Sequence, residues 1–257
     1  MAERTSAGGP GGPSEGGGGP EGGEDLRPIL KKAQEYALEK DWKGYFGAVL
    51  GKPPRDTLLD ALARFDADGA RSGAAAGPRF AVDLGCGEGR DTLELLRRGW
   101  RVLAIDLMPE AFEHLRGRVP EGDLPRLEVR VGRFEDVQLP ACDLLNASFA
   151  LPFCEPARFG EVWSMVAAAI RPGGRFSGQL FGDRDDWIRC GDRCHFSRPE
   201  VERMFAGFVF EHFREEEKEE ADGRGGKHWH LYHIVARKRS TGADPGSNPG
   251  DASFRQV

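Results

Sequence analysis

The chain has 257 residues, of which 42 are acidic and 36 are basic, and its net charge is −6. This length suits one domain of ordinary size with additional segments. Because the sequence has no dense block of Lys and Arg, it argues against a nucleic acid or an anionic membrane surface as the main partner. The longest apolar stretches are strand-sized and the first residues are glycine-rich, so neither a membrane span nor a secretory signal is predicted. We therefore expect a cytoplasmic protein.

Composition divides the chain into four parts and one connecting stretch. Residues 1–25 are rich in Gly and Pro, and residues 240–257 are rich in Gly, Pro, Ser and Asp, so we expect both ends to be disordered tails. Apolar residues at helical spacing predict two helices in residues 26–66, which we interpret as a helical cap. A loose stretch over 67–79 is expected to lead into the main domain, residues 79–239.

Strand and helix patterns then alternate along the chain. Strands are expected at 80–84, 100–106, 127–131, 142–148 and 174–181, and helices at 90–98, 109–118 and 159–170. This order implies parallel strands joined by right-handed crossovers. Ser197 and Glu200 have the spacing of a capping box, and two long strands, 208–218 and 228–238, follow as a hairpin. The sequence therefore predicts an α/β fold with a doubly wound, mostly parallel, seven-stranded, Rossmann-like sheet, closed by a C-terminal antiparallel hairpin.

A glycine-rich segment, AVDLGCGEGRDT at residues 81–92, lies where the first strand leads into a helix. Gly85, Gly87 and Gly89 allow a tight turn and let a ligand approach the backbone closely. Asp106 lies 21 residues after Gly85, at the end of the second strand, where a carboxylate can accept hydrogen bonds from both ribose hydroxyls. The spacing predicts a nucleoside-binding site.

The residues around this turn narrow the choice of nucleoside. Arg90 stands where a dinucleotide fingerprint has its third glycine, which disfavours NAD. No Lys followed by Ser or Thr is present in the segment, which excludes a Walker phosphate loop. Asp83, at the end of the strand, would repel a pyrophosphate and favour a cation. A positively charged nucleoside therefore fits best.

The segment VDLGCGEGRDT, the acid Asp106 and the RPGG that leads into a strand resemble class I S-adenosylmethionine-dependent methyltransferases over residues 79–239. The resemblance implies a methyltransferase with S-adenosyl-L-methionine as its cofactor. It places the methionine part of the cofactor near Asp83, Gly85, Cys86 and Gly87, and the ribose on Asp106. The other cofactor positions that it implies lie against the adenine or beneath the cofactor, and they are Leu107, Met108, Arg133, Phe134, Glu135, Asn146, Ala147 and Ser148.

One of these positions departs from the family pattern. Family members usually have an acid directly after the glycine of the GRFEDVQLP segment, where it meets the adenine amine, whereas this chain has Arg133. Phe134 can still offer a backbone amide, and Glu135 can supply the carboxylate. We therefore keep all three residues as candidates for the adenine contact.

Three further segments, DWKGYFGAVLGKPP, LFGDRDDW and KHWHLYHIVARK, are similar to small-molecule methyltransferases of the tellurite-resistance and thiopurine type. This narrower resemblance implies methyl transfer to a small-molecule acceptor, including a soft inorganic or thiol acceptor. The alternative is a non-catalytic protein that binds S-adenosylmethionine. The identity of the methylated atom (O, N, S, Se or Te) stays open, and the sequence makes no prediction of the oligomeric state.

Candidates for the acceptor site are aromatic, and candidates for a general base come from the loop after the fifth strand. The aromatic set comprises Trp42, Tyr45, Phe46, Phe149 and Trp187, although the same side chains could simply anchor helices to the core. A base is needed only for an acceptor that arrives protonated, such as a hydroxyl. His195 is the first candidate for this catalytic role and Asp183 is the second.

No metal site is predicted. Among the histidines of the last predicted strand, only His228 and His230 share a face, because side chains alternate along a strand. Two imidazoles do not make a zinc site. The spacing of Cys190, Cys194 and His195 matches no established zinc pattern. The acidic run at 214–222 is interpreted as a solvated strand end.

Overall fold

The computed structural model describes residues 33–72, 78–220 and 226–240, and all of them fall within one structural unit, Lys32–Val257. The tails predicted at 1–25 and 240–257 lie outside the described residues, apart from Ser240.

Seven α-helices, four short 3₁₀ helices and eight strands make up the described part of the chain. The α-helices are α1 (Ala33–Glu39), α2 (Trp42–Val49), α3 (Asp56–Ser72), α4 (Arg90–Arg97), α5 (Pro109–Arg116), α6 (Phe159–Ala169) and α7 (Arg198–Met204). The 3₁₀ helices are η1 (Glu121–Arg126), η2 (Leu151–Phe153), η3 (Pro156–Arg158) and η4 (Asp186–Cys190). The strands are β1 (Phe80–Leu84), β2 (Arg101–Asp106), β3 (Leu127–Val131), β4 (Cys142–Ala147), β5 (Ile170–Gly182), β6 (His195–Phe196), β7 (Phe208–Glu220) and β8 (Lys227–Lys238). Among the described helices, none combines the length and the apolar character that crossing a membrane requires.

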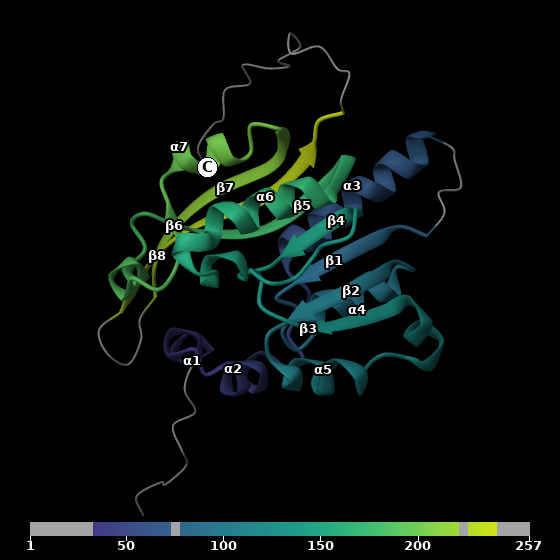
Figure 1. Ribbon diagram of the computed structural model, residues 1–257, viewed down its shortest axis with the longest axis horizontal. Helices are drawn as coiled ribbons and strands as arrows, with labels where there is room; N and C mark the ends of the chain where they lie inside the picture. Colours follow the sequence, from purple (N-terminus) through teal and green to yellow (C-terminus); the bar gives the residue numbers. More distant parts are fainter. Residues whose placement is uncertain (1–32, 73–77, 221–225, 241–257) are drawn as a thin grey trace, which may run out of the picture. The chain divides into compact units, whose positions relative to one another are not determined.

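The strands form one sheet in the order β3-β2-β1-β4-β5-β8-β7 (Figure 1). Strands β1 to β5 pair in parallel, and β8 pairs antiparallel with both β5 and β7. The predicted mostly parallel sheet with a C-terminal hairpin is confirmed. The structure adds a two-residue strand that the sequence did not indicate, β6, which pairs with the end of β5.

Helices cover both faces of the sheet, as the apolar residues of its strands require. Alternate strand residues, such as Val82 and Phe176, pack against α6 and α7. Their neighbours, such as Ala81 and Val102, pack against α3, α4 and α5. Figure 1 shows α6 crossing in front of the strands. A strand buried on both faces has to be apolar at nearly every position, which explains the FAVDL sequence of β1.

The helices before β1 differ from the prediction. The described part of residues 26–66 holds three helices instead of two, and α3 continues to Ser72, into the stretch that we expected to be loose. Helix α2 begins where the Asp41 carboxylate accepts a hydrogen bond from the Gly44 N–H at 3.0 Å. Its two glycines, Gly44 and Gly47, weaken the helical signal in the sequence. The local cap and the packing of the helix therefore override its weak propensity.

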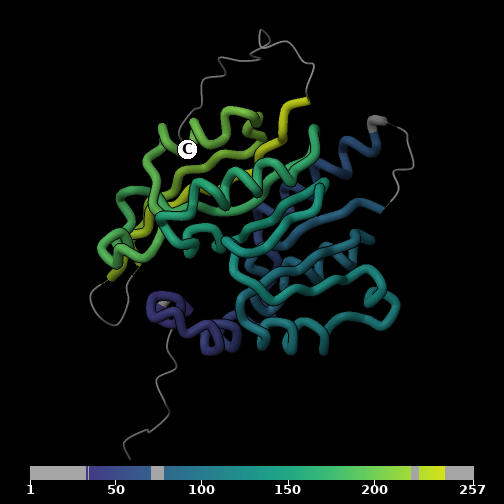
Figure 2. The backbone as a smooth tube through the Cα atoms, viewed as in Figure 1, coloured from purple at the N-terminus to yellow at the C-terminus, as the bar shows by residue number. Residues whose placement is uncertain are grey.

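The loop before β6 holds α1 in place. The guanidinium of Arg193 donates hydrogen bonds to the carbonyls of Ala37 at 3.1 Å and Leu38 at 2.6 Å. Lys40 forms an ion pair with Asp192 at 2.8 Å. In Figure 2 the first described residues, drawn in purple, lie beside the carboxyl ends of the parallel strands. The N-terminal helices therefore stand where open α/β sheets place their ligands.

Candidate active site

The turn after β1 is shaped by glycine. Gly85 has a φ of +73°, and a Cβ at this position would lie 2.5 Å from the Cβ of Ala150. No side chain fits there without displacing the loop after β4. The N–H groups of Gly85 and Cys86 donate to the carbonyl of Ile105 at 2.8 and 3.0 Å, so the turn is held against β2.

Asp106, the last residue of β2, lies directly beside this turn. Its two carboxylate oxygens accept one hydrogen bond each, from the N–H of Gly87 and from the N–H of Met108, both at 2.9 Å. Burial raises the pKa of the Asp106 carboxyl, and these N–H groups oppose that shift. Each oxygen keeps an unused lone pair, so the carboxylate can still accept hydrogen bonds from a diol.

A cavity of about 490 Å³ opens at the carboxyl ends of the parallel strands. Its lining includes most of the predicted site residues. From the cofactor set these are Gly85, Gly87, Asp106, Leu107, Arg133, Phe134, Glu135 and Ser148, and from the acceptor set they are Trp42, Tyr45, Phe46, Phe149 and Trp187. The structure therefore brings the two predicted groups of residues into one space.

A smaller cavity of about 40 Å³ is lined by Asp83 and Cys86, together with residues of the glycine turn. The Asp83 carboxylate is buried and accepts hydrogen bonds from the hydroxyl of Thr92 at 2.5 Å and the amide of Asn146 at 2.9 Å. Burial and the nearby Asp91 carboxylate raise the pKa of Asp83 to about 7. This carboxyl therefore sits in an environment that an additional positive charge would stabilise.

Five predicted residues line neither cavity: Met108, Asn146, Ala147, Asp183 and His195. The N–H group of Met108 donates to the Asp106 carboxylate at 2.9 Å. Asn146 is buried beneath the small cavity, where its amide donates to both Asp83 and Asp91 at 2.9 Å. Ala147 is buried in the core of the sheet. These residues shape the site from below instead of facing its ligand.

Neither candidate base is brought to the cavity. His195 lies on β6 with its side chain buried against Phe181, and burial lowers its pKa. Asp183 lies 3.5 Å from the guanidinium of Arg184, outside the cavity wall. The sequence correctly predicted that both residues follow the fifth strand. It could not predict the pairing of β6 with β5, which determines where their side chains lie. Both residues lie outside the lining of the cavity, and a catalytic role for either stays a prediction.

The adenine-contact candidates Arg133 and Glu135 occupy the cavity wall as a loose ion pair, with Nε and Oε2 3.5 Å apart. The other oxygen of Glu135 accepts the N–H of Glu155 at 2.8 Å. Arg133 thus pairs with acidic side chains and does not replace the acid that the family usually has at this position. Both carboxylate oxygens of Glu135 already have partners within the protein.

Sequence reasoning missed part of the wall. The additional lining residues include Lys40, Lys52, Arg55, Phe153, Phe181, Lys218, Glu220, Trp229 and Leu231. The alternation of Trp229 and Leu231 along β8 was a usable signal, because side chains two apart share one face of a strand. The basic residues between α2 and α3 carried no such signal.

A buried lysine holds two of the tryptophans that form the aromatic wall of the cavity. The rings of Trp187 and Trp229 lie 5.0 Å apart, and the ammonium of Lys227 lies 4.5 and 3.7 Å from their centroids. Lys227 forms a buried ion pair with Asp185 at 2.5 Å. Both tryptophans line the cavity, and their rings are tilted by 58°, so the Lys227–Asp185 ion pair holds a rigid aromatic corner of the cavity wall.

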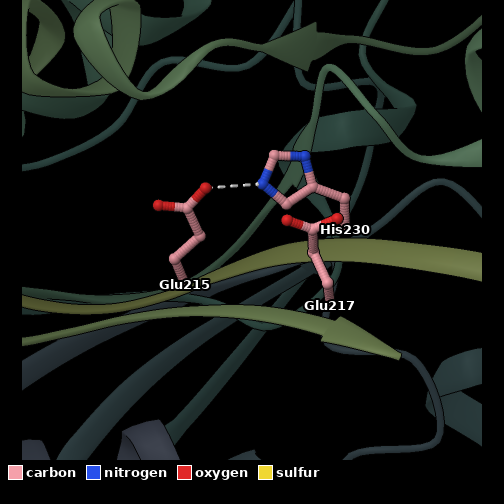
Figure 3. Close-up of side chains that lie close together, drawn as sticks. All are labelled: Glu215, Glu217 and His230. Carbon is pink, nitrogen blue, oxygen red and sulfur yellow. Dashed lines mark hydrogen bonds and ion pairs between the residues drawn. The ribbon is translucent and has the colours of Figure 1, made fainter. Parts of the chain in front are cut away.

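A group of potential metal ligands lies on β7 and β8. Side-chain atoms of Glu215, Glu217 and His230 lie within 4.8 Å of one another, and Figure 3 shows Glu215 facing the imidazole. The guanidinium of Arg184 lies 2.9 Å from Glu215, 2.6 Å from Glu217 and 3.1 Å from His230. This arginine already supplies the cation that balances the two acids, so the group is explained as an ion-pair network.

Comparison with known proteins identifies the domain. Residues 81–174 match the model of a methyltransferase domain. An uncharacterized methyltransferase of Mycobacterium tuberculosis is 34% identical over 119 residues, which are 44% of this chain and 45% of that protein. The chain thus matches less than half the length of this relative.

Two solved structures share the fold. TehB from Haemophilus influenzae has a TM-score of 0.57 at 17% identity, covering 77% of this chain and 67% of that one. The 1,6-didemethyltoxoflavin-N1-methyltransferase of Burkholderia thailandensis has a TM-score of 0.51 at 23% identity, covering 84% and 94%. The sheet topology and the glycine turn with Asp106 agree with the match of residues 81–174 to a methyltransferase domain. In sequence, this chain is therefore similar to methyltransferases over less than half of its length.

Proposed function

We propose that this protein transfers the methyl group of S-adenosylmethionine to a small-molecule acceptor. The observation that carries the proposal is the cavity of about 490 Å³, with Asp106 and the glycine turn on one side and an aromatic wall on the other. A concave, largely aromatic space of this size suits a small or planar molecule better than an extended polymer.

The residues present fit the cofactor. We propose that Asp106 accepts the ribose hydroxyls, that Leu107 and Phe134 contact the adenine, and that the glycine turn and Asp83 receive the methionine end. The bound cofactor supplies an electrophilic methyl group, activated by its sulfonium. The protein then has to orient the acceptor and exclude water, and such positioning can lower a barrier by roughly 7–11 kcal/mol.

The chemistry of the wall favours an acceptor that arrives deprotonated. No histidine is among the described residues that line the cavity. Asp106 is held by two N–H groups, Glu135 accepts the Glu155 N–H, and Glu220 accepts the indole N–H of Trp229. A thiolate, a selenide or a tellurium oxyanion needs no general base. This supports the soft-nucleophile form of the proposal, in line with the resemblance to tellurite-resistance and thiopurine enzymes.

The test is transfer of labelled methyl from S-adenosylmethionine to a panel of acceptors. The panel contains thiols, thiopurines, selenite, tellurite and phenols, beside tRNA and protein substrates. We expect at least one small acceptor to be methylated. Methylation of a macromolecule alone would contradict the proposal, and cofactor binding without turnover on any acceptor would indicate a non-catalytic binding protein.

Replacement of Asp106 tests the cofactor site directly. Asp106→Ala removes two charged acceptors for the ribose, so S-adenosylhomocysteine should bind more weakly by about 1–3 kcal/mol in calorimetry. Asp136→Ala, an exposed acid that does not line the cavity, is the matched control and should bind as the wild type does. Unchanged affinity in the Asp106 variant would show that the ribose assignment is wrong.

A further inference from the structure

Two buried cations lie against the aromatic wall of the cavity. The ammonium of Lys227 lies 3.7 Å from the ring centroid of Trp229 and 4.5 Å from that of Trp187. The guanidinium carbon of Arg193 lies 4.9 Å from the centroid of Trp187 and 5.5 Å from that of Phe153. All three rings line the cavity, whereas each cation is only 5% exposed and lies outside the lining. The cations therefore contact the rings from within the protein.

These contacts affect which ligand the rings can bind. A cation is attracted to an aromatic ring by the negative charge of the π face. Since Lys227 and Arg193 already use this attraction, the rings of Trp187 and Trp229 have less of it to offer to a cationic ligand. The rings still provide area for stacking, which suits a flat ligand. The wall therefore favours a planar molecule and disfavours a positively charged one.

Lys227 is held in this position by Asp185, which is completely buried. The Asp185 carboxylate accepts hydrogen bonds from the Lys227 ammonium at 2.5 Å, from the Trp187 N–H at 2.9 Å and from the His230 N–H at 3.1 Å. The two backbone donors fix the carboxylate between η4 and β8. The cation is thus fixed against the rings before any ligand binds.

The charge of the cavity lining differs in sign from that of the whole chain. The chain has a net charge of −6, yet five basic and three acidic side chains line the cavity. The basic residues are Lys40, Lys52, Arg55, Arg133 and Lys218, and the acidic residues are Asp106, Glu135 and Glu220. A ligand in the cavity therefore meets more positive than negative charge, which favours an anion.

Lys218 places one of these charges beside the aromatic corner. It stands directly opposite Trp229 in the pairing of β7 with β8, so the two side chains share a face of the sheet. Its ammonium lies 3.3 Å from Glu216, but Glu216 also pairs with Arg214 at 2.5 Å. Glu220, on the same face, accepts the indole N–H of Trp229 at 3.0 Å. The positive charge of Lys218 is therefore only partly neutralised by its neighbours.

We propose that the acceptor is a small planar molecule with a fixed negative group, which stacks on the corner formed by Trp187 and Trp229 and directs its charge toward Lys218. Lys227 and Lys218 set this preference, Lys227 from behind the rings and Lys218 from beside them. This inference rests on the proposed function, because it names the class of acceptor for the same cavity.

Three ligands of one shape test the preference for a negative charge. Benzoate is anionic, benzamide is neutral and benzamidine is cationic at pH 7. Their dissociation constants for the complex with S-adenosylhomocysteine can be measured by ligand-observed NMR. We expect the wild type to prefer benzoate to benzamidine by about 10-fold or more, with benzamide between them, because like charges placed side by side oppose binding.

Variants of the two lysines test the assignment of residues. Lys218→Gln should reduce the preference by about 2- to 5-fold, the scale of a half-exposed ion pair. Lys227→Gln should reduce it further, and Lys227→Arg should keep it, because the arginine preserves the cation against the rings. Arg237→Gln removes a positive charge from β8 at a 45% exposed side chain outside the cavity. This control should keep the wild-type preference.

The outcomes separate the two proposals. If the wild type fails to bind S-adenosylhomocysteine, the proposed function fails. If the complex binds benzamidine as tightly as benzoate, or binds none of the three ligands, the inference is overturned and the proposed function stands. A full wild-type preference in both Lys218→Gln and Lys227→Gln would also overturn it. Should Lys227→Gln not fold, the surface variant Lys218→Gln decides alone.

Discussion

Beneath the cofactor cavity, two carboxylates share one amide. Asn146 donates to Asp83 and to Asp91, and Ser148 donates to Asp91 at 2.7 Å. Both acids are buried, so ionising either carboxyl destabilises the folded state unless a nearby cation compensates the charge. The raised pKa of Asp83 reflects this cost, and it makes the site sensitive to protons in the neutral range.

The sign of the Asp83 shift gives a pH-dependent prediction for stability. Since the pKa of Asp83 in the folded state, about 7, lies above its ordinary value of 3.8, the folded state holds the proton more tightly, and Asp83 lowers the free energy of unfolding as pH rises from about 4 to 7. Above pH 7 this loss is complete. Asp83→Asn should therefore raise the melting temperature relative to wild type more at pH 8 than at pH 5. Asp136→Asn, at an exposed acid, serves as the control. An equal change in melting temperature for Asp83→Asn at both pH values would show that the pKa of Asp83 is not raised.

Individual site residues could be predicted from the sequence where the local backbone conformation determines their position. The glycine turn and Asp106 could be found because the spacing within one strand-turn-helix unit determines where they lie. His195 and Asp183 could not be placed, because their orientation depends on the pairing of β6 with β5 and on the ion pair with Arg184. Arg55 was missed for a similar reason, since its partners Phe149 and Asp91 are distant in sequence.

Among the elements, α1 depends most on a single side chain. Arg193 stacks over Phe153 and Trp187 and donates to the carbonyls of Ala37 and Leu38, near the C-terminus of α1. A cation at this end of a helix satisfies carbonyls that have no partner within the helix. The loop before β6 thus positions one wall of the cavity.

Arg193→Gln should loosen α1 without unfolding the sheet. Losing charged hydrogen bonds of this kind costs roughly 1–3 kcal/mol, so amide hydrogen exchange in residues 33–39 should accelerate about 10-fold or more, with β1 and β4 unchanged. Arg189→Gln, in the same loop but with an 83% exposed side chain, is the control. If amide hydrogen exchange in α1 is as slow in the Arg193→Gln variant as in the wild type, packing alone holds the helix.

The sequence predicted elements best where their apolar pattern is continuous. Strands β1 to β4 and helices α4 to α6 agree with expectation within one or two residues, because each buries a regular face, whereas β5 begins at Ile170, four residues before the expected start. Helix α2 was not predicted as a separate element, since its glycines conceal the pattern and its position comes from contacts such as that of Phe46 with His114 on α5.

For the whole molecule, the cavity joins segments from both ends of the described chain. Its walls extend from Ala33 to Leu231, whereas the match to the methyltransferase domain covers residues 81–174. The cofactor side lies mostly within the matched part and could be predicted from it. The opposite wall, which we propose receives the acceptor, draws on α1, α2, β7 and β8, and these elements meet only in the tertiary fold.

Ligand binding should therefore stabilise the whole domain. S-adenosylhomocysteine at 100 times its dissociation constant should raise the free energy of unfolding by about 2.7 kcal/mol, because unfolding disperses the residues that bind it. Denaturant titration with and without ligand measures this difference. At the same ligand concentration Asp106→Ala should show a smaller gain, and no gain in the wild type at saturation would mean that the ligand binds the unfolded chain equally well.

The docking of α1 also sets an order of events during synthesis. Ala37 precedes its partner Arg193 by 156 residues, so α1 leaves the ribosome long before the loop that holds it exists. Strands β1 to β5 can pair during that interval, and the cofactor-binding turn can form with them. The cavity acquires its outer wall only after β6 has been translated, which leaves the nascent cofactor site open to solvent until late in synthesis.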